Sequence, residues 1–187
     1  CPQPVRNRHG GVLGRLAGRP AAIVTFLDGM WIRRPTAAHC AALGQALAHL
    51  HLAGADFDMK RANALGIESW RPLYLQARDR GDSVREGLCE AIAQELDALA
   101  RTWPRDLPQG VIHADLFPDN VFFLADELSG LIDFYFACTD MLAYDVAICL
   151  NAWCFEPDHS YNVTKGRALL KAYASVRALS LNERAAL

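Results

Sequence analysis

The apolar positions of the chain follow a helical spacing over most of its length and a strand-like pattern in two shorter regions. Apolar residues three or four positions apart predict helices over residues 36–53, 69–78, 83–103, 142–153 and 161–176. Short β-rich runs occupy residues 12–27 and 111–133, where turn residues interrupt them. A few strands beside many helices predict an α+β fold, without internal repeats.

Capping residues set the bounds of the two longest predicted helices. Thr36 is a predicted N-cap, and Gly54 ends the same helix. Ser83, followed three residues later by Glu86, predicts a capping box at the start of the second helix. The shorter helix over residues 69–78 requires Pro72 to lie in its first turn, where a missing amide hydrogen costs little.

The first β-rich region predicts an antiparallel hairpin. Its two apolar runs, Val12–Leu16 and Ala21–Leu27, flank the turn signal Ala17-Gly18-Arg19-Pro20. The dipeptide Asp28-Gly29 ends the second run, so the β structure stops before the first long helix.

The second β-rich region predicts a hairpin that gathers polar side chains. Val121–Leu124 is expected to pair with Ser129–Ile132 across a four-residue turn, which would place Asn120 opposite Asp133 at the open end. Facing residues on paired strands have Cβ atoms about 4.5–5.5 Å apart, close enough for two oxygen ligands to share one metal ion. Asp115, five residues before Asn120, would lie on the loop that enters this hairpin.

The composition and net charge of the chain exclude several classes of binding partner. The chain has 187 residues, 52% hydrophobic and 21% charged, with a net charge of −2, as expected of one globular domain with a substantial core. Without a basic block, neither nucleic acid nor an anionic membrane is expected as a partner. No apolar run approaches the roughly 18 residues of a membrane span, so the expected location is the cytoplasm. The six cysteines form no C-x-x-C pair and are predicted to be reduced core residues.

The segment His113-Ala114-Asp115-Leu116-Phe117-Pro118-Asp119-Asn120 has the form H-x-D-x-x-x-x-N, and Asp133 follows 13 residues after Asn120. Phosphoryl transfer depends on such groups, because one carboxylate must face the attacking hydroxyl while oxygen ligands hold magnesium on the phosphates. The motif alone is weak evidence, since Asp and Asn before a strand commonly serve as turn residues. Asp133 at the matching hairpin end and Asp145 at a helix start favour a kinase.

The histidine and tryptophan residues outside this motif do not indicate a second functional site. His39, His49 and His51 share one predicted helix, but they do not have the spacing of an i, i+4 metal pair, so packing or surface roles are expected. Trp31 and Trp70 lie near predicted element ends, where such rings usually seal the edge of a core.

The longer stretches around the motif carry a resemblance to a known family. Gly110–Val121, Leu131–Cys138, Tyr144–Cys154 and Ala22–Gly29 resemble the aminoglycoside phosphotransferase and choline kinase group, and within it the homoserine kinases. The resemblance extends over nearly the whole chain and implies a protein-kinase-like fold. It also implies ATP and Mg²⁺ as ligands and L-homoserine, or a related amino alcohol, as acceptor, in threonine biosynthesis.

The resemblance implies a role for each matching residue. The catalytic residues are Asp115, which orients or deprotonates the acceptor hydroxyl, and His113, which shapes the loop; the magnesium ligands are Asn120 and Asp133; and the residue that supports the loop backbone is Asp145. The adenine-binding hinge would comprise Thr25, Phe26 and Leu27. The acceptor pocket would be bordered by Tyr135, Asn151 and Trp153, although a core role for Trp153 is weighed equally.

One departure from the family pattern concerns the phosphate-binding half. Such kinases carry a lysine on an upstream strand, yet the only lysines here are Lys60, Lys165 and Lys171. The resemblance therefore implies that residues 1–34 are the remnant of the small β-rich lobe with the hinge, and that residues 35–187 are the mainly helical catalytic lobe. The chain is expected to be truncated at its start and inactive alone.

Two other functions stay open at this point. The acceptor of the same chemistry is alternatively an aminoglycoside or choline, although a cationic drug site would favour more acidic residues after Asp133. A different class is a non-catalytic, kinase-like binding module, which the missing lysine favours and the retained Asp115, Asn120 and Asp133 oppose. No oligomeric state follows from the sequence.

Overall fold

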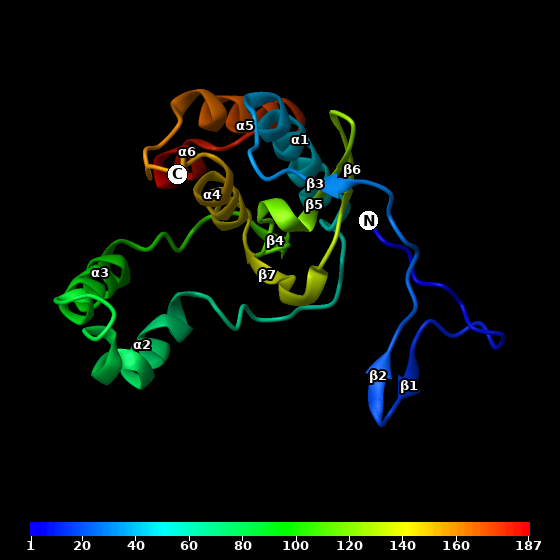
Figure 1. Cartoon of the computed structure of the whole chain (residues 1–187), viewed down its shortest axis with the longest axis horizontal. Helices are drawn as coiled ribbons and strands as arrows, with labels where there is room; N and C mark the ends of the chain where they lie inside the picture. Colours follow the sequence, from blue (N-terminus) through cyan, green and yellow to red (C-terminus); the bar gives the residue numbers. More distant parts are fainter.

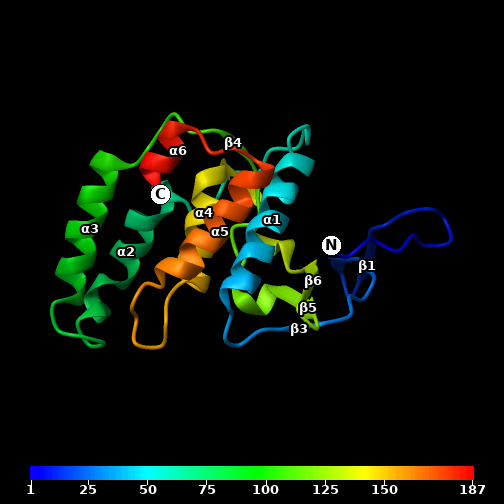
Figure 2. The same cartoon turned by 90° about the horizontal axis from the view of Figure 1, so that it is seen from above.

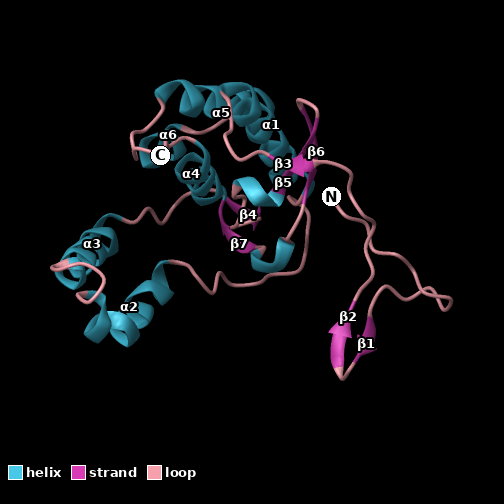
Figure 3. Ribbon diagram, viewed as in Figure 1, coloured by secondary structure: helices cyan, strands magenta, loops and turns pink.

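A computed structural model describes all residues from 1 to 187. Its helices and small antiparallel sheets confirm the α+β class (Figure 1, Figure 3). The helices are α1 (Ala37–Ala53), α2 (Ile67–Gly81), α3 (Leu88–Thr102), α4 (Leu142–Trp153), α5 (Val163–Val176) and α6 (Leu181–Ala186). The strands are β1 (Gly14–Leu16), β2 (Arg19–Ala21), β3 (Met30–Trp31), β4 (Gln109–Ile112), β5 (Val121–Leu124), β6 (Glu127–Leu131) and β7 (Cys138–Met141). None of the helices combines the length and apolar character that a membrane crossing requires.

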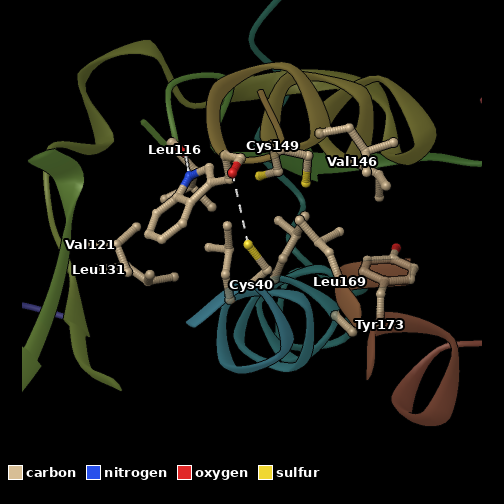
Figure 4. Close-up of a cluster of buried hydrophobic side chains, with 14 of the residues drawn as sticks. Cys40, Leu116, Val121, Leu131, Val146, Cys149, Leu169 and Tyr173 are labelled. Atoms are coloured by element: carbon tan, nitrogen blue, oxygen red, sulfur yellow. Dashed lines mark hydrogen bonds between the residues drawn. The ribbon is translucent and has the colours of Figure 1, made fainter. Parts of the chain in front are cut away.

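The main hydrophobic core lies between α1, α4, α5 and the β5–β6 hairpin. Figure 4 shows side chains from these elements meeting, among them Cys40 of α1, Val121 of β5, Cys149 of α4 and Leu169 of α5. Each of these four side chains is fully buried. Four of the six cysteines are buried and all six are free thiols. The predicted core role is confirmed for these four, whereas Cys1 is exposed and Cys89 is only partly buried.

Helices α1 and α5 lie side by side, as both views of the molecule show (Figures 1 and 2). The predicted N-cap Thr36 and the end at Gly54 are confirmed for α1. Gly44 permits the close approach of the two helices, because a Cβ atom at this position would lie 2.3 Å from the carbonyl oxygen of Leu169. The packing of α1 on α5 therefore requires a residue without a side chain at position 44.

We expect the Gly44→Ala substitution to destabilise the fold. Alanine would gain about 1 kcal/mol in helix propensity, but overpacking against a helix backbone costs about 1–3 kcal/mol and at this distance would require α5 to shift as well. The measurement is urea unfolding followed by circular dichroism. Gly14→Ala in β1 is the matched control, because its new Cβ would have only Ala21 O at 3.9 Å. A Gly44→Ala variant as stable as this control would contradict the steric argument.

The strands form three small antiparallel sheets. β3 pairs with β5 and β5 with β6, β4 pairs with β7, and the β1–β2 hairpin stands away from the helices (Figure 1). Strand β7 was not predicted from the sequence; its partner is β4, with Ile112 opposite Cys138. The first hairpin is shorter than predicted, because Val24 bridges to Pro4 instead of continuing the pairing with residues before β1.

The register of the β5–β6 hairpin differs from the predicted one. The turn has two residues, Ala125 and Asp126, and a bulge follows at Phe122 and Phe123. Ile132, not Asp133, therefore faces Asn120, and its N–H donates to Asn120 O over 3.0 Å. The prediction that Asn120 and Asp133 are directly opposite was wrong by one residue, because a shorter turn and a bulge change the pairing.

The predicted starts of α2 and α3 were also wrong. Pro72 lies in the interior of α2, which begins at Ile67. Helix α3 begins at Leu88 after Gly87, whose φ of 75° belongs to the left-handed region. Ser83 makes no capping box, because its hydroxyl donates back to Arg80 O over 2.6 Å within the turn that reverses the chain between the two helices. The two helices form a hairpin of their own beside the main core (Figure 1).

Candidate active site

The loop between β4 and β5 carries most of the predicted site residues. Asp145, in the first turn of α4, holds its backbone from the protein interior. Its Oδ2 accepts the N–H of His113 over 2.8 Å, and its Oδ1 accepts the N–H of Ala114 over 2.9 Å. Ala114 has a φ of 65°, unusual for a residue with a side chain, so these two bonds hold the loop in a strained turn. The side chain of Asp145 is fully buried.

His51 is a functional residue that the sequence did not single out. Its Nε2 lies 3.1 Å from Asp145 Oδ2, and both side chains are buried. His51 therefore fixes the position of the carboxylate that accepts the two loop amides. The expected packing role fits the burial of His51, but its hydrogen bond to Asp145 was not predicted. The available signal was its place four residues after Leu47 on the buried face of α1, where a polar ring needs a partner.

The ring of His113 joins the loop to the end of the β5–β6 hairpin. Its Nε2 lies 2.9 Å from the carbonyl oxygen of Ile132 and donates to it, since a carbonyl can only accept. The ring packs on Phe134, with the ring centroids 4.6 Å apart. The residue next to Ile132 is Asp133, so His113 couples the position of Asp133 to that of the loop. This geometry fits a loop-shaping role.

Asp115 and Asn120 interact directly. Asn120 Nδ2 donates to Asp115 O over 2.7 Å and to Asp115 Oδ2 over 3.0 Å. Because the amide nitrogen is used in this way, the amide oxygen Oδ1 of Asn120 is left for another partner. Burial and the nearby carboxylates of Asp133 and Asp119 raise the pKa of Asp115, against the opposing effects of Asn120 and His113. A cation placed among these carboxylates would be stabilised.

Asp133 follows the hairpin in a left-handed backbone conformation, with a φ of 61°. Its side chain takes part in none of the ion pairs of the chain and belongs to an exposed residue. No group of three or more His, Cys, Asp or Glu side chains gathers as a protein-only metal site. An oxygen of Asn120 and the carboxylate of Asp133 are suited to a Mg²⁺ ion that takes its remaining ligands from phosphates and water.

The three residues predicted to border the acceptor lie in different environments. Trp153 is only 1% exposed, and its Nε1 donates to Leu116 O over 2.7 Å. The indole therefore supports the loop from the core, and the geometry does not support a contact with the acceptor, because the ring is covered. Tyr135 is 75% exposed and Asn151 is exposed on α4, so a role at the acceptor stays a prediction for these two.

The predicted hinge lies on the extended segment before β3. Thr25 exchanges hydrogen bonds with Gln3, Phe26 is 85% exposed, and Leu27 packs against Gly130 of β6. Ser129 Oγ donates to Asp28 O over 2.7 Å, which ties this segment to the same hairpin that carries Asp133. The assignment of the segment to adenine stays a prediction.

Polar groups also line a small pocket beside the strained turn at Ala114. Arg61 Nη1 donates to Tyr135 O over 2.7 Å and to Ala137 O over 3.3 Å, and Asn63 lies next to Arg61 in the lining. The Asn63 amide in turn donates to Asp140 Oδ2 over 2.8 Å, so both side chains are bonded within the chain and hold the wall of this pocket in place.

Comparison with known proteins gives agreement at the level of sequence and fold. The model of the phosphotransferase enzyme family matches residues 1–179. A homoserine kinase from Xanthobacter autotrophicus is 67% identical over all 187 residues, which make up 58% of that protein. The chain spans about 57–58% of the length of the first curated relatives it matches.

Two solved structures have a similar fold at low identity. The crystal structure of an aminoglycoside-3'-phosphotransferase of type VIII has a TM-score of 0.68 at 23% identity, covering 98% of this chain and 70% of the other. An amicoumacin kinase in complex with AMP-PNP and Ca²⁺ has a TM-score of 0.67 at 17% identity, covering 96% of this chain and 57% of the other. These likenesses confirm the predicted aminoglycoside-phosphotransferase-like fold.

Proposed function

Because the chain belongs to the phosphotransferase enzyme family, we propose that it forms the catalytic part of an ATP-dependent homoserine kinase. The reaction transfers the γ-phosphoryl group of ATP to the side-chain hydroxyl of L-homoserine and yields O-phosphohomoserine, a step of threonine biosynthesis. The observation that carries the proposal is the 67% identity with a curated homoserine kinase along the whole chain. The geometry of Asp115, Asn120 and Asp145 supports phosphoryl transfer as the chemistry.

Asp115 is the proposed catalytic residue. Its carboxylate would accept a hydrogen bond from the acceptor hydroxyl and take its proton as the oxygen attacks phosphorus. Asn120 orients this carboxylate through its Nδ2 hydrogen bond of 3.0 Å to Oδ2. Asp145 and His113 act on the same step indirectly, because they hold the loop that presents Asp115. Positioning of this kind supplies much of the catalysis in phosphoryl transfer.

Asn120 and Asp133 are the proposed Mg²⁺ ligands, through the free amide oxygen of Asn120 and the unpaired carboxylate of Asp133. Bound Mg²⁺ would neutralise developing charge on the phosphates of ATP. A protein contribution of only two oxygen ligands is typical of magnesium sites that share the metal with a nucleotide. The AMP-PNP and Ca²⁺ in the amicoumacin kinase structure support a nucleotide and a divalent cation for this fold.

The remaining proposed roles concern the binding of the adenine of ATP and of the acceptor. Thr25, Phe26 and Leu27 would meet adenine mainly through backbone groups. Tyr135 and Asn151 would border the acceptor, a small amino alcohol.

The acceptor is tested with a completed chimera. We define it as this chain joined to the segments of the Xanthobacter relative that lie outside the match, with the relative itself as the positive control. Phosphorylation is measured with a panel of L-homoserine, choline and an aminoglycoside. We expect kcat/KM for homoserine to exceed that for the other two by about tenfold or more.

Three outcomes of this panel are informative. A preference for choline or the aminoglycoside would keep the chemistry and overturn the acceptor. A folded chimera that binds no nucleotide and phosphorylates nothing, while the relative remains active, would favour a non-catalytic module. A rate of ATP consumption that is the same with and without homoserine would also count against the proposal.

A further inference from the structure

A second polar chain of contacts starts at His51 and leads away from the loop. The hydroxyl of Tyr173 on α5 lies 2.7 Å from His51 Nδ1, the ring nitrogen that does not face Asp145. Arg177 donates from Nη1 to this hydroxyl over 3.1 Å and to Glu183 Oε1 on α6 over 2.8 Å. A continuous row of hydrogen bonds thus connects the last helix of the chain with the backbone of the catalytic loop.

Each member of this row is withdrawn from solvent. Glu183 is 1% exposed although it belongs to a helix of only six residues, and Tyr173 is fully buried. Charged side chains are almost never fully buried without a partner. The carboxylate of Glu183 has two, because Oε1 accepts from Arg177 and Oε2 accepts the N–H of Ser180. An apolar residue would have docked α6 without these requirements.

Every hydrogen bond in the row between Arg177 and Asp145 donates toward Asp145. A guanidinium only donates and an ionised carboxylate only accepts. Asp145 Oδ2 therefore requires the hydrogen of His51 on Nε2, and Nδ1 of the neutral ring must then accept from the Tyr173 hydroxyl. The oxygen of Tyr173 in turn accepts from Arg177. With both ring nitrogens protonated, the hydroxyl hydrogen of Tyr173 would lose its acceptor, since His51 and Arg177 are its only partners.

The ionisation states of Tyr173 and Glu183 agree with this direction of donation. Burial raises the pKa of Tyr173 to about 12, so its hydroxyl keeps the hydrogen that it donates to His51. Burial alone would raise the pKa of the Glu183 carboxyl, but hydrogen bonds from Ser180 and Arg177 bring it below its ordinary value. Glu183 is thus an anion at neutral pH and holds Arg177 in place.

We propose that Glu183, Arg177 and Tyr173 are positioning residues for the catalytic loop. Through Tyr173, whose hydroxyl donates to Nδ1, they hold the His51 ring in place with its Nε2–H facing Asp145, and this contact keeps Asp145 in the geometry that accepts the amides of His113 and Ala114. The loop that carries Asp115 thereby depends on a contact between α5 and α6. The proposal deepens the function proposed above and rests on it for its catalytic consequence only.

The first test uses this chain and needs no activity. We expect ¹⁵N NMR of the wild-type chain to show His51 as the neutral Nε2–H tautomer. Tyr173→Phe should leave the hydrogen on Nε2, because Asp145 still requires it there, but should shift the ¹⁵N resonance of Nδ1, which no longer accepts a hydrogen bond. Glu183→Gln, which keeps the side-chain volume, should increase hydrogen exchange of the His113 and Ala114 amides by more than it increases exchange of the Leu43 amide in α1. Glu183→Gln carries the test if Tyr173→Phe does not fold.

Glu156→Gln is the matched control for Glu183→Gln. Glu156 pairs with Lys165 over 2.8 Å at the other end of α5 and has no contact with His51 or Asp145. If α6 had only a structural role, Glu183→Gln would lower the stability of the chain without changing the exchange of the loop amides relative to that of Leu43. That result, or an equal effect of Glu156→Gln on the loop amides, would overturn the proposal.

The second test measures kinetics in the completed chimera. Glu183→Gln and Tyr173→Phe should lower kcat by about 10- to 100-fold, as is usual when the support of a site residue is removed, with the KM for ATP almost unchanged. Unchanged kcat would refute the catalytic consequence. An inactive parent chimera would instead count against the proposed function, and the NMR and exchange results would still decide the structural part.

Discussion

Replacing Asp115 with alanine in the completed chimera should lower kcat by about two or more decades, the usual size of an acid–base contribution. Asn120 Nδ2 orients this carboxylate through its hydrogen bond to Oδ2, and it also bonds the backbone carbonyl of Asp115. Binding of Mg²⁺ and nucleotide should persist, because Asp115 is not one of the proposed metal ligands. Steady-state kinetics and a nucleotide titration measure the two properties separately.

Two further variants sharpen this result. Asp119→Ala removes an exposed carboxylate four residues away on the same loop, and its turnover should remain close to that of the unsubstituted chimera. Asp133→Ala should weaken Mg²⁺-dependent nucleotide binding, which Asp115→Ala leaves intact. Turnover that survives the loss of Asp115 would remove the mechanism, and Mg²⁺ binding that survives the loss of Asp133 would remove its role as a ligand.

The second large effect is expected for Asp145→Asn in the present chain. Asparagine has nearly the same shape, but its NH₂ group would face either His51 and the His113 amide or the Ala114 amide, all of which donate to Asp145 now. A buried donor left without an acceptor costs about 1–3 kcal/mol. We therefore expect the free energy of unfolding in urea to fall by this amount.

Asp126→Asn provides the comparison for that substitution. Its side chain is fully exposed at the tip of the β5–β6 hairpin, so the same chemical change should alter the free energy of unfolding by no more than about 0.5 kcal/mol. If Asp145→Asn has an effect of similar size to Asp126→Asn, the buried carboxylate does not hold the loop as the structure indicates.

The parts of the fold that the sequence predicted are those that local chemistry decides. Helix α1 begins at Thr36 and ends at Gly54 as predicted, because a capping side chain and a terminal glycine act within a few residues. The loop that carries Asp115 was found for a similar reason, since its motif is contiguous and its function requires residues at fixed spacing. The metal and catalytic roles of these residues stay predictions.

The errors concern features that distant residues decide. Ser83 and Glu86 have the spacing of a capping box but form none, whereas Ser180 and Glu183 have the same spacing and do form one. The difference is tertiary, because Glu183 reaches Arg177 in the interior while the turn after α2 recruits Ser83. The Ser-x-x-Glu pattern therefore predicts a helix start only when the tertiary contacts around it are known as well.

The hairpin register and His51 were missed for the same physical reason. Ala125 adopts a φ of 54° in a two-residue turn without the glycine or asparagine that usually signals one, so the turn length could not be read locally. His51 acquires its role from Asp145, 94 positions later. Neither the turn length nor the contact between His51 and Asp145 produces a periodic pattern in the sequence. His51 and Asp145 meet only because α1 packs against α4.

Helix α4 holds the loop at two points, through Asp145 near its start and Trp153 at its last residue. Eight residues separate these points, a rise of about 12 Å in a regular helix. Inserting a single residue between them would turn one anchor by about 100° relative to the other and carry it out of reach of its loop group. The length of α4 between its anchors thus behaves as a fixed quantity of this fold, and natural variation in chain length should be accommodated on either side of it.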